Sequence, residues 1–255
     1  MSWFTRRSEA PLSPTAAAQQ QAAAEARAAR TPTQRFIREW ILPIGVVMAI
    51  MAPIRSVVAD WNDVPSGSMR PTILEGDRIY VNKLAFGLRL PFTNTYLARW
   101  DEPRRGDIAT FASPADGIRL VKRVIGVPGD TIELRNNALF VNGVQARTSI
   151  TSTSSQPIPG RAAVSATLAL ENFSGADHAI EIIPGAASRS TFGPVIVPAG
   201  KYFMMGDNRD MSNDSRYIGM VPLESFYGRC SGVALSLDPE SSYWPRWDRW
   251  CSPLR

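Results

Sequence analysis

Residues 119–144 read RLVKRVIGVPGDTIELRNNALFVNGV, and this stretch decides the fold class. It contains three short apolar runs, at 119–127, 131–135 and 138–141, and each ends in residues that form tight turns. These turn residues are Pro-Gly-Asp at 128–130, Asn-Asn at 136–137 and Asn-Gly at 142–143, the last typical of a type I′ hairpin. The stretch therefore predicts consecutive antiparallel strands.

Similar short runs at 78–83, 107–111 and 201–205 extend this mostly β pattern over the chain. Residues 148–199 differ: they open with TSITSTSSQPIPG, which we expect to be a loop, and continue with weaker strand signals at 162–170 and 179–183. We therefore predict an inserted lobe at 148–199 within a core made of 60–147 and 200–255.

The N-terminal part has a different composition. Residues 8–34 are rich in Ala, Gln, Pro and Thr, so we expect a flexible tail over 1–36. No charge occurs in WILPIGVVMAIMAPI at 40–54, and with 55–59 the run reaches about 20 residues, enough at ~1.5 Å per residue for a ~30 Å hydrocarbon layer. This predicts a transmembrane anchor at 37–59; a cleaved signal peptide or a buried soluble helix are the alternatives.

Charge and cysteine content limit the function further. The formal net charge is +5, of which +3 falls in residues 1–39, so the rest carries too little positive charge for a nucleic-acid surface. The arginines before the anchor place 1–36 in the cytoplasm and the rest of the chain outside it. Cys230 and Cys251 have no zinc-site spacing, and they could form one disulfide or remain free thiols.

A serine lies close after the predicted anchor, in PSGSMRPT at 65–72. Serine needs a base before it attacks a carbonyl, and the usual base is histidine. The chain has one histidine, His178, which lies far from every motif and which we expect at the surface or in a loop. The three lysines, Lys83, Lys122 and Lys201, are therefore the candidate bases.

Lys122 is the best of the three because of its strand parity. It shares a face with Leu120 and Val124, and burial among apolar side chains lowers a lysine pKa toward neutrality. Lys83 and Lys201 lie at strand ends, where the ammonium can reach water. A lysine that protects an exposed strand edge is the structural alternative for Lys122.

A third polar segment, GDNRDMSNDSR at 206–216, follows the strand at 201–205. Alone it would be a solvated turn with surface ion pairs. With PSGSMRPT, GDRIYVNK at 76–83, RGDI at 105–108 and VKRVIGVPGD at 121–130, it resembles bacterial type I signal peptidases in the order of the segments. The resemblance implies an antiparallel β-barrel-like fold after one transmembrane helix, and a membrane-bound endopeptidase that removes signal peptides from exported preproteins.

The resemblance also implies a role for individual residues. Ser68 would be the nucleophile and Lys122 the general base, while the Ser66 hydroxyl and the Ser68 backbone N–H would form the oxyanion hole. Ser212 would hydrogen-bond to Lys122 and orient it, and four residues would brace the site by ion pairs: Asp207, Asp214, Arg123 and Arg216. Met211 departs from the family pattern, which usually has Asn at this position.

The implied enzyme needs no metal and no organic cofactor, and its partners are the signal peptides of preproteins and the lipid bilayer. It would lie in the bacterial inner membrane with its catalytic part on the periplasmic side. Trp61, Trp244, Trp247 and Trp250 could rest at the membrane interface or pack on the barrel. Two other functions remain open: a specialised processing peptidase of the same clan, and a non-catalytic anchored β module.

Overall fold

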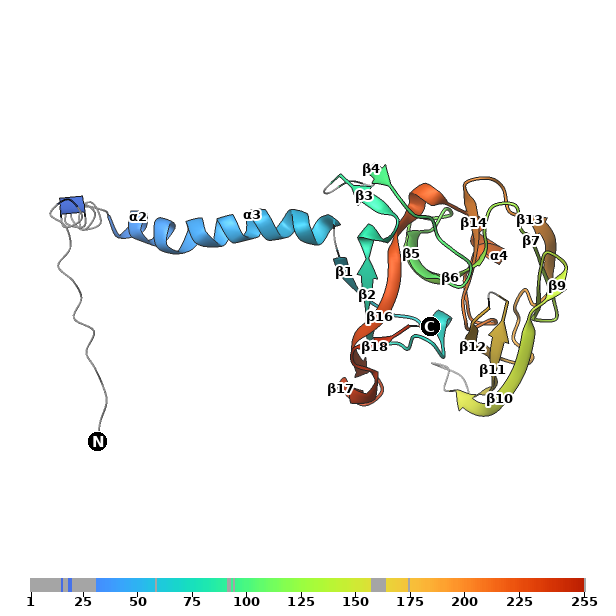
Figure 1. The fold of residues 1–255 in the computed structure, drawn as a ribbon. Coiled ribbons are helices and arrows are strands. Elements are labelled where there is room, and N and C mark those ends of the chain that lie inside the picture. The colour runs from blue at the N-terminus through green and yellow to red at the C-terminus, as the bar shows by residue number, and fades with distance from the viewer. Residues whose placement is uncertain are drawn as a thin grey trace, which may run out of the picture. The chain divides into compact units, whose positions relative to one another are not determined.

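The computed structural model describes residues 15, 18–19, 31–57, 59–90, 93, 95–156, 164–173 and 175–254. The chain divides into two compact units, Met1–Ala52 and Pro53–Arg255, which we describe separately. Figure 1 shows the N-terminal helices and the β-rich body.

The described N-terminal residues are helical. α2 (Pro32–Phe36) starts at the N-cap Thr31, whose hydroxyl accepts from the Gln34 N–H, and a π-helical turn (Ile37–Ile41) leads into α3 (Leu42–Val57). Among the described residues, none of the helices combines the length and the apolar character that crossing a membrane requires. Residues 37–57 of the predicted anchor at 37–59 are helical, as the π-helical turn runs directly into the 16-residue α-helix.

The body is mostly β, as predicted, and all of its strand pairs in the main sheet are antiparallel. Figure 1 shows these strands following a curled path. The order is β1-β2-β16-β5-β6-β14-β15, and β17 and β18 both pair with β16. The strands are β1 (Ala59–Asp63), β2 (Asp77–Asn82), β5 (Ile108–Ala112), β6 (Arg119–Gly126), β14 (Lys201–Met205), β15 (Val221–Pro222), β16 (Phe226–Asp238), β17 (Trp244–Pro245) and β18 (Ser252–Pro253).

The stretch 131–145 forms the predicted hairpins. β7 (Thr131–Arg135), β8 (Ala138–Val141) and β9 (Val144–Gln145) join β13 (Phe192–Ile196) in a four-stranded sheet. Asn136, Asn137, Asn142 and Gly143 all have positive φ, between 50° and 78°, which is the conformation that type I′ turns require. A separate two-stranded sheet contains β3 (Gly87–Arg89) and β4 (Tyr96–Arg99).

The expected loop at 148–160 is wrong for its first nine residues. β10 (Arg147–Gln156) pairs with β11 (Val164–Asn172), and β11 pairs with β12 (Asp177–Ile182), in a third antiparallel sheet. The Thr and Ser residues of this segment fit a pleated, exposed strand, and a register shift between Ile150 and Ser152 accommodates the pairing. Residues 157–160 lie outside the described part of the chain.

Three hydrophobic clusters fill the body. Phe86, Phe111, Tyr202 and Phe226 dominate one cluster, and a second lies between β6, β14 and the β7–β8 hairpin. The third contains Val64, Met69, Ile73 and Ile79, and it anchors both ends of the segment that carries Ser68. Short helices complete the fold: η2 (Gly67–Met69), η3 (Lys83–Ala85), α4 (Ser215–Ile218), η4 (Leu223–Ser225) and η5 (Trp247–Arg249).

Candidate active site

Ser68 lies in a single 3-10 turn, η2, that follows the edge strand β1. Ser66 precedes the turn in an extended conformation, and Met69 at its end is only 1% exposed. The Ile73 N–H donates to the Met69 carbonyl at 2.9 Å, and the Ile73 side chain is also fully buried. The buried side chains of Met69 and Ile73 therefore hold the turn against the core, while Ser68 stays half-buried.

Lys122 reaches Ser68 from the centre of β6. Its Nζ donates a hydrogen bond to Ser68 Oγ at 2.5 Å, across 54 residues of sequence. The side chain is 2% exposed, and this burial lowers the pKa of Lys122 to about 8, although the carboxylates of Asp214 and Asp207 act in the opposite direction. A lysine in this state can exchange a proton with a serine hydroxyl near neutral pH.

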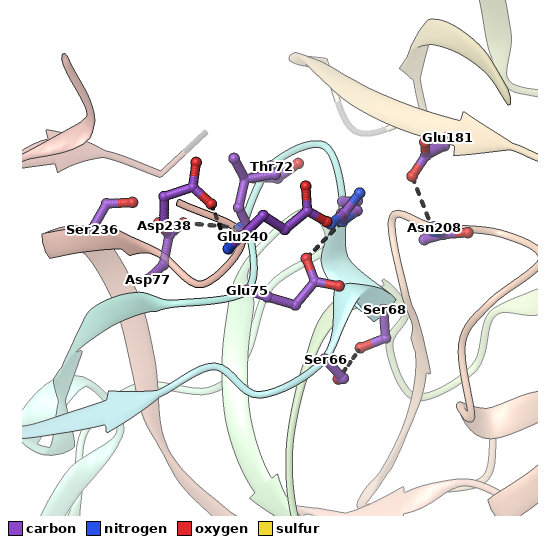
Figure 2. Close-up of polar contacts among 12 residues, drawn as sticks. Ser66, Ser68, Thr72, Glu75, Asp77, Glu181, Asn208, Ser236, Asp238 and Glu240 are labelled. Carbon is purple, nitrogen blue, oxygen red and sulfur yellow. Dashed lines mark hydrogen bonds and ion pairs between the residues drawn. The ribbon is translucent and has the colours of Figure 1, made fainter. Parts of the chain in front are cut away.

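Ser66 lies on the same side of the turn as Ser68. Its hydroxyl donates to Ser68 Oγ at 3.5 Å, a contact drawn in Figure 2. This is a long contact, and Ser66 is exposed. The Ser66 hydroxyl thus lies close to the Ser68 hydroxyl.

The loop at 206–216 packs directly behind the serine. A Cβ added to Gly206 would lie 2.3 Å from the Ser68 carbonyl oxygen and 2.3 Å from Ser212 Oγ, so no side chain fits there. The Asn208 N–H donates to the Ser68 carbonyl at 3.2 Å. Gly206 therefore permits the close approach, and Asn208 holds the Ser68 backbone in place.

Ser212 lies beside this contact but does not make the hydrogen bond that we expected. Its Oγ is buried and has no hydrogen-bond partner within the part of the chain that the structure describes. The expectation of an Ser212–Lys122 hydrogen bond is therefore wrong for this arrangement, in which the Lys122 ammonium donates to Ser68 instead. Met211, where the sequence departs from the family pattern, is 45% exposed.

The four predicted bracing residues form two buried ion pairs. Arg123 donates to both Asp207 oxygens, at 2.8 and 2.7 Å, and Arg216 donates to both Asp214 oxygens, at 2.8 and 2.9 Å. Burial alone would raise the pKa of Asp207, but the Arg123 guanidinium holds it below its usual value. Thr72 Oγ1 also donates to Asp207 at 2.5 Å, which ties the segment after Ser68 to this loop.

Sequence reasoning missed a third buried pair. Arg209 donates to both carboxylate oxygens of Glu171 on β11, and both side chains are fully buried. The expected surface position of His178 is wrong: it is 4% exposed on β12, with Nε2 3.5 Å from Glu171. Glu171 shares a strand face with buried Ala169, and this parity is the signal that could have indicated its burial.

The loop also joins β12 through its backbone. The Glu181 N–H donates to the Asp207 carbonyl at 2.9 Å, and the Arg209 N–H donates to the Glu181 carbonyl at 2.8 Å. Figure 2 shows the side-chain contact that accompanies them, from Asn208 Nδ2 to Glu181 at 3.0 Å. The three-stranded sheet therefore holds the loop that contacts the Ser68 carbonyl.

The remaining candidates lie elsewhere. Lys83 pairs with Asp60 at 3.3 Å, and Lys201 is exposed at the start of β14. Cys230 is a buried free thiol and Cys251 an exposed one, so they form no disulfide. Within the described ranges, no group of three or more His, Cys, Asp or Glu side chains is arranged to hold a metal ion.

Comparison with known proteins places this arrangement in a family. Residues 37–235 match the family described as "Signal peptidase, peptidase S26". The chain is 38% identical over 219 residues to "Signal peptidase I" of Pseudomonas aeruginosa, covering 80% of this chain and 74% of that protein. It is 32% identical over 227 residues to "Signal peptidase I" of Rickettsia typhi, covering 81% and 83%.

A solved signal peptidase I from Enterococcus faecalis V583 is 31% identical and covers 51% of this chain and 97% of its own, with a TM-score of 0.31. The assignment rests on the sequence matches, which span most of the chain and include both Ser68 and Lys122. The chain belongs to the signal peptidase family, peptidase S26.

Proposed function

We propose that this chain is a membrane-bound serine endopeptidase that cleaves N-terminal signal peptides from exported preproteins, with Ser68 as nucleophile and Lys122 as general base. The hydrolase class follows from the family and from relatives named signal peptidase I. The observation that carries the assignment of residues is the 2.5 Å contact between Lys122 Nζ and Ser68 Oγ inside a site that lowers the lysine pKa.

The first half of the reaction forms an acyl-enzyme. Neutral Lys122 accepts the Ser68 proton while Ser68 Oγ attacks the scissile carbonyl carbon. The Ser66 hydroxyl and the Ser68 N–H stabilise the oxyanion of the tetrahedral intermediate. Protonated Lys122 then gives its proton to the leaving amine, so the C–N bond breaks and the signal peptide stays on Ser68 as an ester.

The second half releases the signal peptide. Lys122, neutral again, takes a proton from a water molecule that attacks the ester carbonyl. The Ser68 oxygen leaves and recovers its proton from Lys122. Asp207, Asp214, Arg123 and Arg216 take no part in these transfers; their ion pairs fix the loop that supports Ser68.

The substrate would bind as an added strand. β2, which contains Ile79, pairs with β1 on one side and β16 on the other, so it offers no free edge. β6 pairs with β5 along 119–123, but its described pairs with β14 involve only residues 123–126. The unpaired side of 119–122 leads to Lys122 and is the edge that we propose for the residues before the scissile bond.

We further propose that the enzyme is anchored in the bacterial inner membrane by one segment near 37–59, with 1–36 in the cytoplasm and a periplasmic catalytic core of 60–147 and 200–255. The uncharged sequence at 40–54 supports an anchor. Trp61, Trp244 and Trp247 are each at least 60% exposed, which suits contact with a lipid interface. The division of the chain into these segments stays a prediction.

The proposal can be tested with the full chain in detergent and an exported preprotein. Wild-type protein should cleave the preprotein at the end of its signal peptide, and Ser68→Ala should abolish cleavage. Ser231→Ala, an exposed serine on β16, is the matched control and should retain full activity. Cleavage that persists in Ser68→Ala would contradict the proposed nucleophile, while inactive wild-type protein would favour a non-catalytic module.

A further inference from the structure

A pocket of about 860 Å³ lies next to the Ser68 turn, and no step of the proposed mechanism uses it. Pro65, which precedes Ser66, is part of its lining, as are Arg70 and Glu75. A Cβ added to Gly67 would lie 2.6 Å from Glu75 Oε1, so this carboxylate packs against the turn itself. Figure 2 shows Glu75 beside Ser66 and Ser68, with Asp238 and Glu240 beyond it.

Hydrogen bonds join the walls of this pocket. The Gly76 N–H donates to the Val64 carbonyl at 3.1 Å, and the Leu237 N–H donates to the Gly76 carbonyl at 3.0 Å. Gly76 has φ 84°, and an added Cβ would lie 2.0 Å from the Leu237 carbonyl oxygen. Arg246, the residue directly after β17, donates to the Glu75 carbonyl at 3.0 Å. The pocket is therefore a fixed part of the fold rather than a gap between loops.

One carboxylate in the lining of the pocket has no ion-pair partner among the described residues. Three arginines and four carboxylates line the pocket, and the arginines are used in three ion pairs: Arg70–Glu75 at 2.6 Å, Arg78–Asp63 at 2.5 Å and Arg246–Asp238 at 3.0 Å. Glu240 is exposed and pairs with no cation among the described residues. The pocket thus combines one free negative charge with apolar walls from Val64, Leu74, Leu237 and Pro239.

The position of the pocket relative to Ser68 indicates which part of a bound substrate would enter it. The side of β6 that faces away from β5 has no described partner strand from Arg119 to Lys122, and Arg119 Nη1 donates to Asn62 on β1 at 2.7 Å. Residues before the scissile bond, bound there, would lie alongside β1. The pocket begins where β1 ends, at Asp63, and continues through residues 70–78. A chain that crosses Ser68 from the β6 edge would leave toward the pocket.

Resting on the proposed function, we propose that this pocket binds the first residues after the scissile bond, and that Glu240 makes it favour lysine or arginine there. An exposed charge pair is worth little in water, so the preference should be about two- to five-fold in kcat/KM and should weaken with salt.

The test uses the full chain in detergent at low salt and two synthetic signal-peptide substrates. These differ only at the second to fourth positions after the scissile bond, which are lysine in one and glutamate in the other. Wild-type protein should cleave the lysine substrate about two- to five-fold faster, and Glu240→Gln should bring the ratio near one. Glu224→Gln, a control at a carboxylate that is 72% exposed and outside the pocket, should keep the wild-type ratio.

Binding of labelled product peptides to Ser68→Ala, by fluorescence anisotropy, separates the pocket from the chemistry. The lysine peptide should bind more tightly than the glutamate peptide, and adding Glu240→Gln should remove the difference. If the wild type cleaves neither substrate but this binding difference persists, the proposed function fails and the pocket assignment stands. Equal binding of both peptides, or a preference unchanged by Glu240→Gln, would overturn the assignment.

Discussion

Lys122 and Arg123 are neighbours on β6 and each is 2% exposed, yet burial has opposite consequences for them. Arg123 makes two hydrogen bonds to Asp207 and keeps its charge inside the body. No carboxylate among the described residues lies within ion-pair distance of Lys122, whose contact is the neutral Ser68 hydroxyl, and its pKa falls to about 8. Pairing lets Arg123 keep its charge inside the body, whereas the unpaired Lys122 has the lowered pKa that suits the general base we propose.

The largest expected effect is on kcat/KM, when Lys122 is replaced by arginine, the residue found next to it at position 123. Lys122→Arg keeps a positive charge, but arginine does not release its proton in a protein, so Ser68 has no base. We expect kcat/KM for a signal-peptide substrate to fall by at least about 10³-fold, without recovery at high pH. Lys201→Arg, at an exposed lysine, is the matched control. Substantial activity in Lys122→Arg would mean that another group acts as base.

The converse change removes the partner of Arg123. Asp207→Asn leaves a buried guanidinium with no carboxylate, which should lower the free energy of unfolding by about 3–5 kcal/mol. Arg104→Gln, which breaks an exposed pair with Asp101, should change it by less than about 1 kcal/mol. Chemical denaturation followed by tryptophan fluorescence measures both. Similar values for the two variants would show that the buried pair does not brace the loop.

Lys122→Met should make the protein more stable. The folded-state pKa of about 8 lies below the ordinary 10.5, so below pH 8 the folded protein bears the penalty of a buried ammonium. Removing it should raise the free energy of unfolding by on the order of 3 kcal/mol at pH 7. The gain should shrink as the pH rises from 8 to 10.5, because the folded lysine is already neutral in this range while the unfolded lysine still carries its proton. A gain that stays constant with pH would contradict this cause.

The smallest of these effects concerns Ser66. Its hydroxyl is exposed and 3.5 Å from Ser68 Oγ, so Ser66→Ala should leave stability unchanged within about 0.5 kcal/mol. As an oxyanion donor it should nevertheless matter to kcat, which we expect to fall about 10²-fold with little change in KM. Steady-state kinetics separate the two parameters. Unaltered kcat would leave the Ser68 N–H as the oxyanion donor without help from Ser66.

Much of the fold could be predicted because it depends on local signals. The strands at 131–135, 138–141 and 201–205 have the predicted bounds, since turn residues such as Asn142 and Gly143 mark their ends. The segment at 148–156 was the failure, because polar Thr and Ser residues indicate a loop until a partner strand is known. Its pairing with β11 is a non-local interaction that the segment's own sequence does not contain.

For the candidate site, the contact between Ser68 and Lys122 agrees with what the sequence indicated. Strand parity selected Lys122, and the family resemblance supplied the residues placed around Ser68. The Arg209–Glu171 pair and the burial of His178 could not be predicted, because each depends on how the three-stranded sheet packs against the loop at 206–216. The missing Ser212 hydrogen bond is also a matter of three-dimensional geometry that spacing does not determine.

The most direct test of a neutral Lys122 is its own titration. The chain has only three lysines, so lysine labelled with ¹³C at Cε gives three NMR signals, which Lys83→Arg and Lys201→Arg assign. The account predicts that the remaining signal titrates near pH 8 and vanishes in Lys122→Met. If all three signals titrate near 10.5, Lys122 is charged at neutral pH and cannot be the base.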